Sequence, residues 1–158
     1  MLIGGGQEKG LRAGTLNVPG IVGLGEACRL CEQQLLEESV RVGALRDRFE
    51  VVLLETVPEA LRNGDLSSRL PGNSSLTFPG IDAEALVVNA SELAISTGSA
   101  CTSGAPEPSH VLLAIGLSRK DASSTIRIGV GRFNTEEEME RAAGVIARSV
   151  ERLARMRI

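Results

Sequence analysis

The sequence predicts an α+β fold in which a small sheet is packed with helices. Segments with alternating apolar and polar residues are short and few, helical patterns lie between them, and one long helical pattern precedes them all. The chain has 158 residues, which suits one domain of ordinary size. Only three residues are aromatic, and all three are phenylalanine, so we expect a core of Leu, Ile, Val and Ala.

The first half of the chain is predicted to hold a glycine-rich segment and a long helix. Residues 4–17 are too rich in glycine and charge for a helix or a buried strand. Pro19 suits the first turn of a helix, and a helical pattern runs from Ile21 to about Glu55, weakened locally by glycines. Residues 61–65, LRNGD, predict a turn.

The second half is predicted to alternate short strands and helices. We expect strands at 73–78, 93–96 and 124–130, and helices at 83–89, 109–115 and 136 to about 156. Asp82 is the expected N-cap of the first helix, Gly116 closes the second, and Thr135 with Glu138 forms a capping box for the third. Glu137 with Arg141 and Glu151 with Arg155 are expected to form ion pairs on that last helix.

Composition and charge exclude several classes of protein. The net charge is −3 and no basic stripe with interleaved aromatic residues is present, so we expect no nucleic-acid partner. No stretch approaches the roughly 18 consecutive apolar residues of a membrane span. Three cysteines without a secretory signal favour a reducing compartment, and we predict a cytoplasmic protein.

Cys101 and Arg127 are the residues whose surroundings best suit chemistry. Cys101 lies among Ser, Thr and Gly in a polar loop predicted for residues 97–108, which keeps a thiol accessible and lets it move. A functional thiol and an inert loop cysteine both remain open on this evidence. Arg127, within the strand predicted at 124–130, suits bidentate binding of a carboxylate, although an isolated strand arginine is more often simply solvated.

Other candidate residues have simpler interpretations. Cys28 and Cys31 lack a second pair of metal ligands, so we interpret them as small residues on one helical face and predict no metal site. His110, the only histidine, has no carboxylate nearby in the sequence and is assigned a surface or packing role. Residues 4–6 and 12–15 suit a phosphate, but their spacing matches neither recognised phosphate loop.

Three segments occur in the order found in the cysteine desulfurases, and the chain resembles that family. GGGQEKGLRAGT at 4–15 looks like the family's GGGQE-x-G-x-R-x-GT segment. SACTSG at 99–104, with EPS at 107–109, resembles the catalytic loop of NifS- and IscS-like enzymes. STIR at 124–127 with GRFNTEE at 131–137 is similar to their C-terminal signature. The resemblance therefore implies a class V aminotransferase fold and covers nearly the whole chain.

The resemblance also implies a domain organisation. It matches the chain to the small C-terminal domain of a fold-type I pyridoxal-phosphate-dependent transferase, preceded by a long connecting helix. Residues 1–18 would be the tail of the cofactor-binding domain, 19–46 the connecting helix, and 47–158 the small domain that carries the cysteine loop.

The family converts L-cysteine into L-alanine and a protein-bound persulfide with pyridoxal phosphate. The resemblance implies that Cys101 attacks the substrate sulfur and carries it to an acceptor or an iron–sulfur scaffold protein. It also implies that Arg127 binds the substrate carboxylate. Thr15 would bind the cofactor phosphate, reaching across from the other subunit of a homodimer.

One departure from the family pattern concerns the lysine that anchors the cofactor. The family places it upstream in a Ser-x-His-Lys type motif, whereas this chain contains only Lys9 and Lys120, neither in that context. We therefore expect the C-terminal part of a desulfurase, inactive alone. The alternative is a non-catalytic sulfur-carrier or scaffold-docking module derived from a desulfurase, and a related lyase or aminotransferase ranks third.

Overall fold

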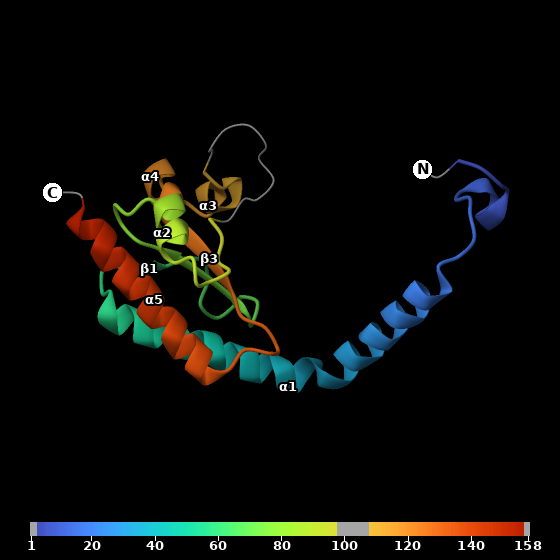
Figure 1. Cartoon of the computed structure of the whole chain (residues 1–158), viewed down its shortest axis with the longest axis horizontal. Helices are drawn as coiled ribbons and strands as arrows, with labels where there is room; N and C mark the ends of the chain where they lie inside the picture. Colours follow the sequence, from blue (N-terminus) through green and yellow to red (C-terminus); the bar gives the residue numbers. More distant parts are fainter. Residues whose placement is uncertain (1–2, 98–107, 157–158) are drawn as a thin grey trace. The chain divides into compact units, whose positions relative to one another are not determined.

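The computed structural model describes residues 3–97 and 108–156 (Figure 1). Contacts divide the chain into two units, Met1–Glu37 and Glu38–Ile158, and helix α1 (Val18–Thr56) contributes to both. The domain limits expected from the sequence, after residues 18 and 46, remain predictions. Among the described residues, no helix combines the length and apolar character needed to cross a membrane.

The first unit contains η1 (Gln7–Gly10) and the first part of α1. The expectation that 4–17 forms no helix needs one correction, because η1 is a single 3-10 turn. Glu8 and Lys9 within it have φ angles of 49° and 55°, so the turn does not continue into a regular helix. The long helix is confirmed and begins at Val18, slightly before the expected Ile21. None of the residues 3–37 is buried.

The second unit is built on an antiparallel sheet in the order β1-β2-β3, formed by Leu61–Arg62, Asn73–Thr77 and Thr125–Gly129. Two predicted strands, at 73–78 and 124–130, are confirmed. The first two residues of the turn expected at 61–65 instead form the strand β1. The chain turns after them, at Gly64, whose φ is 84°.

The strand expected at 93–96 is wrong. In that segment only Ser96 pairs with the sheet, through an isolated bridge to Arg127. The Leu93 N–H donates instead to the Ala90 carbonyl at 2.9 Å, so the segment begins in a local turn after a helix.

Four more helices complete the second unit: α2 (Ala83–Asn89), α3 (His110–Ala114), α4 (Arg119–Ser123) and α5 (Glu136–Arg155). Three were predicted, and α2 has its expected cap, because Asp82 accepts the Ala85 N–H at 2.8 Å. Helix α4 was missed. Its start follows the same rule, since the Ser118 hydroxyl accepts the Asp121 N–H at 3.1 Å.

One of the two ion pairs predicted on α5 is confirmed. Arg155 contacts Glu151 at 2.5 Å, one turn earlier on the same helix. Arg141 pairs instead with Glu92 at 2.8 Å, so Glu137 is not its partner. A carboxylate from another segment has displaced the local partner, which spacing along one helix does not reveal.

A single core cluster joins α1, the sheet, α2 and α5. Its fully buried members include Phe49, Leu76, Leu86 and Ile146, one from each of these elements. The expectation of a purely aliphatic core is corrected by Phe49 and Phe78, which are 0% and 1% exposed. The third phenylalanine lies outside the core.

The strands divide their side chains between an apolar face and a polar face. Ile126 and Ile128 of β3 belong to the core, and Arg127 between them is exposed. Ser75 of β2 lies directly opposite Arg127 in the antiparallel register. Because neighbouring residues of a strand point to opposite faces, the polar face displays Arg127 on a scaffold anchored by the core.

The capping box of α5 predicts a pH dependence of stability. Glu138 accepts hydrogen bonds from the Asn134 side chain and from the Thr135 N–H, both at 3.1 Å, and these bonds lower the pKa of Glu138 below 4.5. A carboxyl whose pKa is lowered by folding stabilises the protein above its unfolded pKa, and this contribution is lost as the pH falls through the folded pKa. We therefore expect Glu138→Gln to lower the Tm at neutral pH, with a difference from the wild type that shrinks below pH 4.5. Thermal unfolding followed by circular dichroism from pH 7 to pH 3 measures this difference, and one that persisted at pH 3 would contradict the assignment.

Candidate functional site

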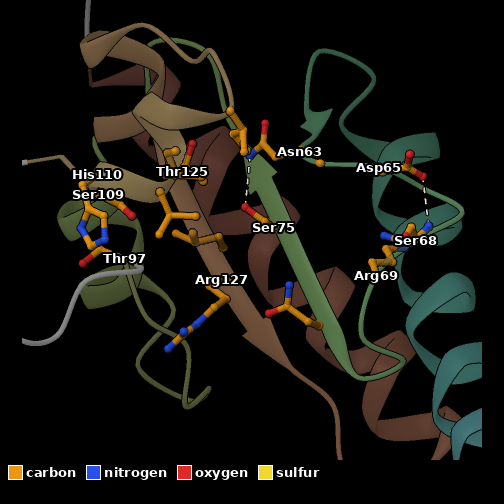
Figure 2. Close-up of a pocket in the computed structure, with 16 residues that line it drawn as sticks. Asn63, Asp65, Ser68, Arg69, Ser75, Thr97, Ser109, His110, Thr125 and Arg127 are labelled. Atoms are coloured by element: carbon orange, nitrogen blue, oxygen red, sulfur yellow. Dashed lines mark hydrogen bonds between the residues drawn. The ribbon is translucent and has the colours of Figure 1, made fainter.

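A pocket of about 350 Å³ lies on the polar face of the sheet in the second unit (Figure 2). Side chains from β2, β3, α3 and the β1–β2 connection line it, together with Thr97. The described lining residues are Asn63, Gly64, Asp65, Ser68, Arg69, Asn73, Ser75, Thr97, Ser109, His110, Val111, Leu112, Ile115, Thr125, Ile126 and Arg127. This volume suits a small ligand, since pockets for small molecules begin at roughly 300 Å³.

Arg127 is the predicted site residue that the structure places in this pocket. Its backbone is held on both sides, by pairing of β3 with β2 and by the bridge to Ser96, whose carbonyl accepts the Arg127 N–H at 2.7 Å. Its side chain is exposed and makes no hydrogen bond or ion pair with the described part of the chain. A rigid strand therefore presents an available guanidinium, which matches the planar geometry of a carboxylate.

A chain of hydrogen bonds fixes the sheet wall of the pocket. The Asn63 side-chain amide donates to the Thr77 hydroxyl at 2.9 Å, and the hydroxyls of Thr77 and Thr125 lie 2.7 Å apart. The Thr125 hydroxyl donates in turn to the Asp121 carbonyl at 2.7 Å. Thr77 and Thr125 are buried, so these bonds satisfy polar groups that water does not reach. The network ties the β1–β2 connection, β2 and β3 to α4 beside Arg127.

Arg69, a second cation at the pocket, is engaged in ion pairs within the protein. Its guanidinium contacts both oxygens of Glu50, at 2.7 and 3.0 Å, and Asp47 at 2.9 Å. The hydrogen bond to Glu50 raises the pKa of Arg69. Glu50 is 1% exposed and also accepts the Ser74 hydroxyl at 2.8 Å. Arg69 thus neutralises a buried carboxylate and holds the β1–β2 connection against α1.

Asp65 is also satisfied locally. One of its oxygens accepts the N–H groups of Ser67 and Ser68, at 2.7 and 3.0 Å, and the Ser67 hydroxyl at 2.7 Å. The hydrogen bond from the Ser67 hydroxyl, followed by those from the two N–H groups, lowers the pKa of Asp65. The carboxylate therefore shapes the turn.

His110 is a pocket residue that the sequence interpretation missed. It is exposed at the first position of α3 and lines the pocket beside Ser109 and Thr97 (Figure 2). Its imidazole makes no hydrogen bond or ion pair with the residues that the structure describes. Its place in the sequence, just after the predicted loop that contains Cys101, is a signal that could have indicated a position at the site.

Cys101 lies outside the described residues, but the residues that flank its segment do not. Thr97, which precedes residues 98–107, and Ser109, which follows them closely, both line the same pocket as Arg127. The described residues on both sides of Cys101 in the sequence therefore line this pocket.

Thr15 belongs to the first unit and is exposed. Arg12 donates to the carbonyls of Gly14 and Thr15, at 3.0 and 3.3 Å, and the Gln7 side chain accepts the Gly14 N–H at 3.3 Å. The segment is therefore folded on itself, helped by Gly14, whose φ is 94°. The Thr15 hydroxyl makes no hydrogen bond with the described residues.

The remaining candidates carry no site in the described part of the chain. Cys28 and Cys31 are exposed, free thiols on α1. The described residues contain no group of three or more His, Cys, Asp and Glu placed to hold a metal ion.

Comparisons with known proteins place this architecture among characterised families. The family model described as Aminotransferase class-V matches residues 5–142. "Cysteine desulfurase IscS" of Anaeromyxobacter dehalogenans (strain 2CP-C) is 46% identical over 153 residues, covering 97% of this chain and 38% of that protein. Its counterpart in Ehrlichia chaffeensis (strain ATCC CRL-10679 / Arkansas) is 42% identical over 156 residues, covering 99% of this chain and 38% of that protein.

Solved structures agree with these matches. A structure described as a NifS-like protein superposes with a TM-score of 0.81 and 33% identity, covering 97% of this chain and 39% of its own. A NifS-like protein from Rickettsia africae ESF-5 gives 0.75 and 30%, covering 98% and 39%. The chain thus spans less than two fifths of the length of these relatives.

Proposed function

The chain belongs to the class V aminotransferase family, and from this premise we propose that it is the C-terminal part of a pyridoxal-phosphate-dependent cysteine desulfurase. The observation that carries the proposal is the pocket lined by Arg127, which has no partner among the described residues, and by Thr97 and Ser109, which lie on either side of Cys101 in the sequence. The match to the cysteine desulfurases over nearly the whole chain supports it.

Arg127 binds the carboxylate of L-cysteine in this proposal. Two N–H groups of a guanidinium form parallel hydrogen bonds to the two oxygens of a carboxylate, which sets the orientation of the amino acid as well as its affinity. Strand pairing keeps the backbone of Arg127 in place before the substrate arrives, so only its side chain has to reorganise on binding.

Cys101 accepts the substrate sulfur. Only three residues separate it in the sequence from Thr97, which lines the pocket. The Cys101 thiolate attacks the sulfur of the bound L-cysteine, a sulfur–sulfur bond forms and the substrate carbon–sulfur bond breaks. The electron pair of that bond stays with the substrate carbon, which takes up the proton released when the Cys101 thiol ionised, and this yields L-alanine and a persulfide on Cys101.

Pyridoxal phosphate, when bound, supplies the electron sink that makes this carbon–sulfur cleavage accessible. Thr15, from the other subunit of a homodimer, would donate a hydrogen bond from its hydroxyl to the cofactor phosphate. The chain's two lysines, Lys9 and Lys120, do not line the pocket, so the anchoring lysine comes from the part of the enzyme that this chain does not cover. We therefore propose that the chain is inactive alone.

The exposed apolar residues of the first unit support a larger assembly. Ile21, Leu24 and Leu36 are 54%, 67% and 83% exposed, and no residue from 3 to 37 is buried. A helical segment with no buried residue gains little stability from packing. We propose that the remainder of the enzyme covers it. The acceptor of the sulfur is a scaffold or carrier protein, and the cytoplasmic location stays a prediction.

Alanine formation tests this proposal. The chain alone, with L-cysteine and pyridoxal phosphate, is expected to make no L-alanine above the rate of the free cofactor. A fusion to the part of the Anaeromyxobacter dehalogenans relative that this chain does not cover is expected to restore it. Alanine from the chain alone would contradict the proposed inactivity. A well-folded but inactive fusion, beside an active intact relative, would contradict the desulfurase assignment.

A sulfur-carrier or scaffold-docking module derived from a desulfurase is the second candidate. In this function Cys101 receives sulfur from a separate, intact desulfurase. Mass spectrometry of the chain after incubation with such an enzyme and L-cysteine distinguishes the two. A persulfide on Cys101, combined with an inactive fusion, is the result expected for a carrier.

A further inference from the structure

Two titratable side chains that line the pocket make no hydrogen bond or ion pair with the described part of the chain. Of its described titratable residues, Arg69 is engaged with Glu50 and Asp47, and Asp65 is engaged with the serines that follow it. Arg127 and His110 are the two that are left. Polar groups that line a pocket and have no internal partner are available to a ligand.

We infer that His110 is a second ligand-binding residue, which donates a hydrogen bond to the carboxylate that Arg127 binds. This inference rests on the proposed function, in which Arg127 holds a small carboxylate. An ionised carboxylate offers about four acceptor positions, and a bidentate arginine uses two of them. The imidazole N–H can take one of those that remain. The ligand class is a small amino acid, because the pocket holds only about 350 Å³.

The positions of the two side chains support a shared ligand. Figure 2 shows His110 beside Thr97 and Ser109, with Arg127 projecting from β3 toward the same side of the pocket. His110 is held at the start of α3, where Leu112 is buried and the Leu113 N–H donates to the Ser109 carbonyl at 3.1 Å. In a pocket of this size, a ligand anchored on one of these side chains lies close to the other.

Nuclear magnetic resonance on the isolated chain tests this inference without requiring catalysis. His110 is the only histidine, so the imidazole signals need no further assignment. L-Alanine is the probe, because it carries the carboxylate and amino groups but no sulfur. We expect L-alanine to shift the His110 imidazole signals, and Arg127→Gln to abolish the shift. His110→Ala is expected to weaken L-alanine binding about three- to tenfold, the worth of one hydrogen bond.

His110→Gln separates a ligand contact from a structural role, because its amide also donates a hydrogen bond. We expect this variant to bind L-alanine within about twofold of the wild type. Unchanged affinity in His110→Ala, with Arg127→Gln still defective, would overturn the role of His110 and leave that of Arg127 intact. If L-alanine moved neither the imidazole signals nor the amide signals of Ser75 and Thr125, both roles would be contradicted. Where His110→Ala failed to fold, the wild-type imidazole shift and His110→Gln would decide.

Discussion

Replacing Cys101 by serine is expected to reduce L-alanine formation by at least about a thousandfold in the fusion of this chain to the uncovered part of its Anaeromyxobacter relative. A serine hydroxyl is a weak nucleophile near neutral pH and cannot take up sulfur as a persulfide, whereas a thiolate can. Initial rates of alanine formation at saturating L-cysteine measure the effect. The loss should appear in kcat, because Cys101 acts on a substrate that other residues bind.

Cys28 and Cys31 are the matched controls for this variant. Both are exposed thiols on α1, and serine at either position removes a cysteine without removing a packed side chain. We expect Cys28→Ser and Cys31→Ser to keep the activity of the parent fusion. Substantial alanine formation by Cys101→Ser, or an equal loss in a control, would show that Cys101 is not the sulfur acceptor.

Replacing Glu50 by alanine is expected to destabilise the second unit by about 3–5 kcal/mol. Glu50 is 1% exposed and accepts hydrogen bonds from Arg69 at 2.7 and 3.0 Å and from the Ser74 hydroxyl at 2.8 Å. Its removal leaves the largely buried Arg69 guanidinium with Asp47 but without Glu50, and the fully buried Ser74 hydroxyl without its acceptor, which costs more than losing a surface ion pair. Urea unfolding followed by circular dichroism gives the free energy of unfolding.

Glu55→Ala is the control, because Glu55 lies on the same helix but is exposed. We expect it to change the free energy of unfolding by less than about 0.5 kcal/mol. A loss below about 1 kcal/mol in Glu50→Ala would show that the charge cluster contributes little to stability. Contacts other than the Arg69–Glu50 ion pair would then have to hold the β1–β2 connection at the pocket.

Elements with strong local signals could be predicted from the sequence. The long helix α1 follows from sustained helical periodicity, and α2 and α5 begin at capping residues whose hydrogen bonds are local. Arg127 was placed on a strand because alternation over a few residues is enough to define one. The resemblance to the cysteine desulfurases rests on three short motifs and is confirmed at the level of the family.

Features that depend on distant partners could not be predicted. Whether 93–96 pairs as a strand depends on the edge of β3, and β1 is too short for a periodic pattern. Arg141 finds Glu92, far away in the sequence, instead of its helical neighbour. His110 looked isolated because its pocket is assembled by β2, β3 and the β1–β2 connection, which periodicity cannot bring together.

The location of sulfur after turnover tests the central claim most directly. The fusion protein is incubated with L-cysteine and pyridoxal phosphate without an acceptor, and its cysteine-containing peptides are then analysed by mass spectrometry. Our account predicts a gain of one sulfur atom on the peptide that contains Cys101 and none on the peptide that contains Cys28 and Cys31. Alanine formed with no additional sulfur on Cys101 would contradict it.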